Sequence, residues 1–149
     1  FNQAVDYIET AKRCLNTYRT KMREQQKTPQ DVVAVFIAIG EDEQEAKDLV
    51  RCLDVWLLGK KEFTEFDRFP SIKTARDYEI SEADIEKVEK NRTRLVWGTK
   101  ETVIEKLKNL AMEFELEELM CIPLVPTIER RKNIIEILAK ELMEKEEKN

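Results

Sequence analysis

Five basic side chains lie between residues 60 and 80, where they could bind an anionic group. They are Lys60, Lys61, Arg68, Lys73 and Arg76. Phenylalanines and a tyrosine lie among them, and no clean helix or strand period runs through the segment. A set of cations on one segment attracts anions such as a phosphate-bearing substrate. The alternative is that these are solvated charges on a loop that does no chemistry.

The rest of the chain offers few catalytic groups. It contains no histidine, and its three cysteines, Cys14, Cys52 and Cys121, are too widely spaced for a zinc site. All three lie within apolar patterns, which predicts buried, reduced thiols. Reduced thiols favour the cytoplasm as the compartment. We predict no metal site and assign no catalytic residue from these side chains.

Two further pairs of residues have a chemical and a structural interpretation. Trp56 and Trp97 could flank a planar ring system, although packing in a core is the more common use of tryptophan. Glu117 and Glu118 are adjacent, so within a strand they point to opposite faces and do not form an acid/base pair. The three glycines of the chain are too far apart to form a phosphate-binding loop.

Composition limits the class of protein. The chain has 149 residues, enough for one domain, with 42% hydrophobic and 38% charged residues and a net charge of −5. An acidic chain without a basic run does not favour nucleic acid as a partner. No apolar stretch approaches the roughly 20 residues that cross a bilayer, so we expect no membrane partner.

Two apolar segments predict strands that are buried on both faces. Residues 32–39 are a continuous β-branched and apolar run, and residues 118–123 contain a second, shorter one. The helices that must position the candidate groups follow from apolar residues at steps of three and four. We predict helices at residues 4–26, 41–58, 81–92, 100–114 and 128–145, and a lid-like loop at 60–80.

Two buried strands, each followed by a helix, indicate an α/β fold with parallel strands. Two strands cannot cover each other, because each needs a neighbour on both edges and helices on its faces. Roughly 25 cal/mol is lost for each Å² of apolar surface left in water. Residue 1 also lies almost directly on a helical pattern. We therefore expect 1–149 to be a single partial domain of a larger barrel or sheet.

Four motifs in order resemble the bacterial luciferase-like, flavin-dependent monooxygenases. Residues 15–22, Leu-Asn-Thr-Tyr-Arg-Thr-Lys-Met, resemble the Leu-x-x-Tyr-Arg-x-x-Phe helix of that family. Residues 40–46, Gly-Glu-Asp-Glu-Gln-Glu-Ala, resemble its "T-D-E-E-A" helix start after a valine-rich strand. Residues 96–103 resemble "V-V-G-(T/S)-P-E-T-V", and Glu-Leu-Met at 118–120 with Glu-Arg-Arg at 129–131 resembles its final strand and helix.

This resemblance implies the C-terminal half of a (β/α)8 TIM barrel that is helix-rich and incomplete as an isolated chain. Residues 32–39 and 118–123 would be its seventh and eighth strands. The implied reaction is oxygenation of an organic substrate with reduced flavin and O₂, using FMN or a deazaflavin, with a separate flavin reductase as partner. The loop at 60–80 would be the lid over the flavin and substrate, and its closure would exclude water.

Three positions depart from the family pattern. Lys100 stands where a proline is usual, Thr127 where an aspartate is frequent, and Ile135 where a serine is frequent. The residues that hold flavin in the family lie on earlier strands, so this part alone is expected to be inactive and to bind FMN weakly. The alternative is a non-catalytic, truncated relative that acts as a binding or assembly module. In either case, open strand edges predict a homo-oligomer.

Overall fold

The computed structural model describes residues 3–59 and 68–143 of the chain. Its order of elements is α1 (Gln3–Glu24), β1 (Val32–Gly40), α2 (Glu43–Leu58), α3 (Ile72–Asp77), α4 (Glu82–Arg92), β2 (Leu95–Thr99), α5 (Lys100–Glu113), β3 (Glu118–Pro123) and α6 (Ile128–Leu138), followed by a π-helical turn at Ala139–Met143. The predicted α/β fold class is confirmed, because helices cover a parallel sheet in the order expected of βα units.

The sheet has three parallel strands in the order β2-β1-β3. β1 lies in the centre because its apolar run suits a strand that is covered on both faces. Ile37 is fully buried and Val35 is 8% exposed. β3 pairs with β1 in register from Val32 opposite Glu118 to Ile37 opposite Pro123. The two strands predicted from the sequence are therefore adjacent and parallel.

The third strand, β2, was not among the predicted strands. It is only five residues long, and Gly98 and Thr99 end its apolar run, so it has too few positions to show a strand period. It becomes a strand because Phe36–Gly40 of β1 supplies its pairing partners, from Leu95 to Thr99. Tertiary pairing, and not local sequence, decides this element.

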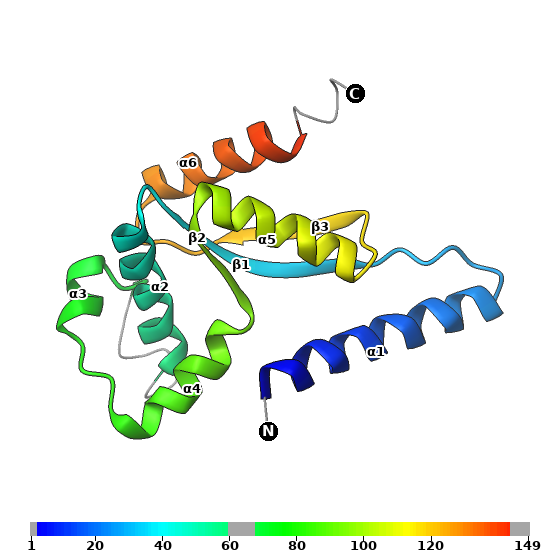
Figure 1. Ribbon diagram of the computed structural model, residues 1–149, viewed down its shortest axis with the longest axis horizontal. Coiled ribbons are helices and arrows are strands. Elements are labelled where there is room, and N and C mark those ends of the chain that lie inside the picture. Colours follow the sequence, from blue (N-terminus) through cyan, green and yellow to red (C-terminus); the bar gives the residue numbers. More distant parts are fainter. Residues whose placement is uncertain (1–2, 60–67, 144–149) are drawn as a thin grey trace.

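Helices cover both faces of the sheet (Figure 1). On one face, Val35 and Ile37 pack in a cluster with Val103 and Leu107 of α5 and with Ile134 of α6. Phe36, whose side chain points to the opposite face, packs in a second cluster with residues of α2. β2 lies on one side of β1 and β3 lies on the other. The connection from β1 to β2 therefore runs in the opposite direction to the connection from β2 to β3. Right-handed crossovers in opposite directions place their helices on opposite faces.

Arg19 makes the most buried polar contacts between the long first helix and the rest of the chain, and Lys12 Nζ of the same helix lies 2.7 Å from Glu113 Oε1 of α5. Arg19 is 9% exposed, and its Nε donates to Asp31 Oδ2 at 2.5 Å. Its Nη2 donates to the carbonyl oxygens of Phe114 at 2.8 Å and Glu115 at 3.1 Å, where α5 ends. These carbonyls have no partner within α5, so Arg19 caps that helix while it fixes α1. Figure 1 shows α1 running beside the sheet and away from α6.

Two predicted segments differ from the structure. Of the loop predicted at 60–80, residues 60–67 lie outside the described residues, and α3 occupies Ile72–Asp77. Ser71 begins α3 by accepting a hydrogen bond from the Thr74 amide at 3.1 Å, and Ala75 is fully buried. The final helix predicted at 128–145 is α-helical only to Leu138 and continues as a π-helical turn.

Part of the sheet face near the start of β1 remains uncovered. Val32 is 48% exposed and Met120 is 55% exposed, on the face that α2 covers only farther along the strands.

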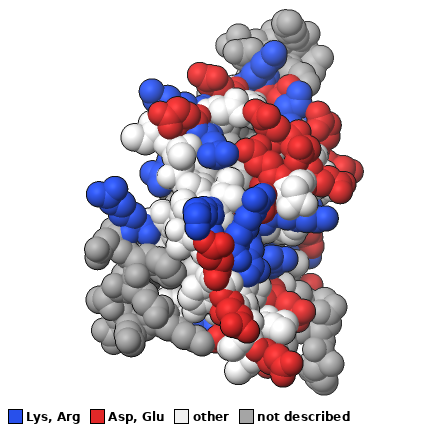
Figure 2. Space-filling model, turned by 90° about the vertical axis from the view of Figure 1, so that its left-hand side faces the viewer, with Lys and Arg blue, Asp and Glu red and all other residues white. Residues whose placement is uncertain are grey.

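Figure 2, seen from the side of α2, α3 and α4, shows basic side chains next to acidic ones, with acidic groups gathered at one side. Among the described residues, no helix is long and apolar enough to cross a membrane.

Candidate functional site

The carboxyl ends of the three strands form one edge of the sheet. β1 ends at Gly40 opposite Thr99 of β2, and Ile37 lies opposite Pro123 of β3. The Leu124 amide donates to the Ile37 carbonyl at 3.1 Å, which keeps β3 beside β1 as it leaves the sheet. In α/β barrels and open parallel sheets, ligands bind at this edge. The turns that follow the strands therefore make up the candidate site.

The turn after β1 is built around Gly40. A Cβ at this position would lie 2.2 Å from the Ala46 backbone nitrogen, so any side chain would collide with α2. Asp42 then caps α2, because its Oδ1 accepts from the Glu45 amide at 2.8 Å. Glu45 in turn accepts at Oε2 from the Glu41 amide, also at 2.8 Å. The first bond satisfies one of the amides that a helix start leaves unpaired, and the second pairs the amide of the residue before the cap.

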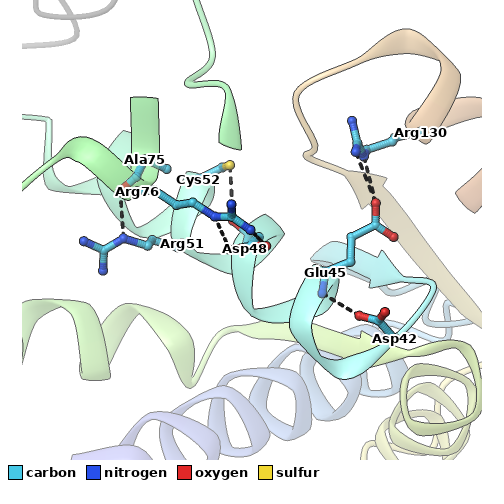
Figure 3. A network of polar contacts seen from close by, with 8 residues as sticks. All are labelled: Asp42, Glu45, Asp48, Arg51, Cys52, Ala75, Arg76 and Arg130. Carbon is cyan, nitrogen blue, oxygen red and sulfur yellow. Dashed lines mark hydrogen bonds and ion pairs between the residues drawn. The ribbon is translucent and has the colours of Figure 1, made fainter. Parts of the chain in front are cut away.

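Glu45 also connects this turn to α6. Its Oε1 lies 3.2 Å from both Nε and Nη2 of Arg130 (Figure 3). Thr127 caps α6 by accepting from the Arg130 amide at 3.3 Å, as its position at the helix start predicts. Arg131 Nε donates to the Val125 carbonyl at 3.1 Å and closes the loop after β3. The two turns are thus fastened to one another by side chains.

These interactions have a structural role. The carboxylates of Asp42 and Glu45 are engaged with backbone amides and with Arg130, and no described group beside them is an activated nucleophile. No group of histidine, cysteine or acidic residues in the described chain could hold a metal ion.

The five basic residues singled out in the sequence fall into three situations. Lys60 and Lys61 lie outside the described residues, and Arg68 is exposed. Lys73 Nζ lies 2.6 Å from Asp77 Oδ2 on the same helix, α3. Arg76 forms a bidentate pair with Asp48 of α2, with Nε 2.9 Å from Oδ1. The structure therefore brings Lys73 and Arg76 together on α3 but pairs each with a carboxylate.

The contact with Arg76 changes the titration of Asp48. The hydrogen-bonded guanidinium lowers the pKa of this carboxyl below its ordinary value, since it stabilises the ionised form more than burial destabilises it. The same pair raises the pKa of Arg76. The side chain of Asp48 is 10% exposed and that of Arg76 is 58% exposed, so the pair lies at the boundary between α2 and solvent.

Sequence reasoning missed a set of polar anchors on α2. Asp54 is fully buried and pairs with Arg92 of α4, whose Nη2 lies 2.6 Å from Oδ2. Arg51 donates from Nε to the Ala75 carbonyl and from Nη2 to the Tyr78 carbonyl, each at 2.7 Å. Together with Asp48, these residues hold α3 and α4 against α2. The available signal was the presence of charged residues within an otherwise apolar helix.

The aromatic and thiol groups have packing roles. Trp56 packs against Phe69 with ring centroids 5.7 Å apart, and Trp97 has the Arg92 guanidinium 5.5 Å from its ring centroid. Burial raises the pKa of the Cys52 thiol to about 11, which makes this cysteine a poor nucleophile. Cys14 is exposed and Cys121 is only partly buried, so the prediction that all three thiols are buried is confirmed for Cys52 alone.

Comparison with known proteins gives partial matches. No family model matches the chain. It is 34% identical to the uncharacterized protein YwcH of Bacillus subtilis (strain 168) over 95 residues, which are 64% of this chain and 28% of YwcH. It is 31% identical to the uncharacterized protein YceB of the same organism over 111 residues, 74% of this chain and 33% of YceB. The chain thus spans about a third of the length of these relatives.

Among solved structures, the chain is similar to apo-MsnO8, a luciferase-like monooxygenase, with a TM-score of 0.68 and 16% identity. The match covers 87% of this chain and 40% of MsnO8, whose fold is TIM-barrel-like. At this level of identity the likeness concerns the fold alone.

Proposed function

We propose that this chain is the C-terminal part of a luciferase-like, flavin-dependent monooxygenase, and that it supplies wall and support to a barrel whose flavin-binding groups lie elsewhere. The observation that carries this proposal is the adjacent, parallel pair β1 and β3, with α5 packed against β1, matching part of MsnO8 over most of the present chain. The four ordered sequence motifs support the same relationship independently, because they depend on side chains and not on backbone shape.

The site geometry supports a positioning role for this chain, with the catalytic groups of such a barrel on its other strands. The side chains at the strand ends hold one another, through the Asp42 cap and the pair of Glu45 with Arg130. A barrel needs such fixed turns because catalytic groups from other strands must be placed within fractions of an ångström. FMN, or a deazaflavin, would supply the oxygen chemistry when bound. This chain would position the edge of the site and exclude water from it.

Fewer basic residues are available for the proposed lid than the sequence predicted. Lys73 and Arg76 have carboxylate partners, so the anion-binding role would fall to Lys60, Lys61 and Arg68. Replacing these three with glutamine in a complete barrel is expected to weaken flavin or substrate binding. Replacing Lys73 serves as the matched control. Unchanged flavin affinity and turnover after the triple replacement would remove the lid from the proposal.

The whole proposal is tested with two proteins. One is the 149-residue chain, and the other is a chimera in which this chain replaces the aligned segment of YwcH. Titration with FMN, followed by flavin fluorescence, is expected to show binding by the chimera and little or none by the isolated chain. Reduced flavin supplied by a reductase should then be reoxidised by O₂ in the chimera's site.

Two results would contradict the proposed function. Stoichiometric FMN on the isolated chain would show that this part holds the cofactor. A folded chimera that binds neither FMN nor a deazaflavin would favour the alternative of a non-catalytic binding or assembly module.

A further inference from the structure

We draw no further inference here: the strongest candidate, the groove that Arg51, Arg76 and Arg92 line between α2, α3 and α4, belongs to the anchors already described, because each of these arginines is bonded to a carboxylate on α2 or to main-chain carbonyls at the end of α3.

Discussion

At the scale of single residues, a few charged side chains on the described chain act as anchors. Arg19 joins α1, the segment before β1 and the end of α5, and the pairs Arg76–Asp48 and Arg92–Asp54 hold α3 and α4 to α2. Arginine suits this role because its planar group donates several hydrogen bonds in fixed directions. A sequence in which many residues are charged thus reaches a defined fold partly through a few partly buried ion pairs.

Arg19→Ala should destabilise the chain by about 2–3 kcal/mol, because it removes a charged donor and leaves the Phe114 carbonyl without its partner. Chemical denaturation measures the change. Arg13→Ala is the matched control on the same helix, since Arg13 is exposed, and its effect should stay within about 0.5 kcal/mol. Similar losses in the two variants would contradict the anchoring role of Arg19.

The Arg76–Asp48 pair predicts a pH dependence with a defined sign. Arg76 lowers the pKa of Asp48 in the folded chain below its unfolded value, so the folded state stabilises the ionised carboxylate. This contribution is complete above the ordinary aspartate pKa and is lost as the pH falls through the lowered one. Arg76→Gln should therefore reduce the melting temperature at neutral pH, and the curves of variant and parent should converge in acid. A constant difference at all pH values would refute this role of the pair.

At the scale of elements, the close approach of α2 to the end of β1 determines the turn that lies at the candidate site. Gly40 permits the approach because it lacks a Cβ, and Asp42 and Glu45 complete the start of α2. Glu45 then reaches Arg130 at the start of α6. The two helices that follow adjacent strands are therefore fixed by the same glutamate.

Gly40→Ala tests this close approach. The added methyl would meet backbone atoms, which cannot rotate away, so α2 must shift. We expect a loss of about 1–3 kcal/mol in denaturation experiments. Gly59→Ala is the comparison, since Gly59 has a φ of 46° but no atom within 3.4 Å of the added carbon, and only the cost of a left-handed backbone, about 1–2 kcal/mol, applies. A neutral Gly40→Ala would show that the turn is looser than described.

At the scale of the whole molecule, the covered and uncovered parts of the sheet are the main feature. α5 and α6 cover one face, α2 covers the other face toward the carboxyl ends, and the region around Val32 and Met120 stays open. This open region gives the isolated chain a surface on which apolar groups meet water.

Met120→Lys should weaken self-association of the isolated chain, because it places a charge on the uncovered sheet face. Sedimentation velocity over a range of concentrations measures the change. Met112→Lys is the control, since Met112 is 70% exposed on α5 and away from that face. A parent chain that sediments as a monomer at all concentrations would contradict the predicted assembly.

The sequence by itself determined the elements with long patterns. The continuous apolar run of β1 and the steps of three and four in α2 and α5 require buried strands and one-sided helices, because burial depends on side-chain periodicity. The order of these elements was also sufficient for an α/β fold with parallel strands. The start of α6 at Thr127 followed from local capping chemistry alone.

Only the tertiary structure decided the features that depend on distant partners. β2 is a strand because β1 lies beside it, and α3 is a helix held by Arg51 and Asp48 of α2. The carboxylate partner of Arg76, which turns an expected ligand-binding cation into an anchor, depends on the same packing. Lys73 differs, because its partner Asp77 lies one turn farther along α3. A short segment or a single charge has no period of its own, so its role is set by the groups that the fold brings within hydrogen-bonding distance.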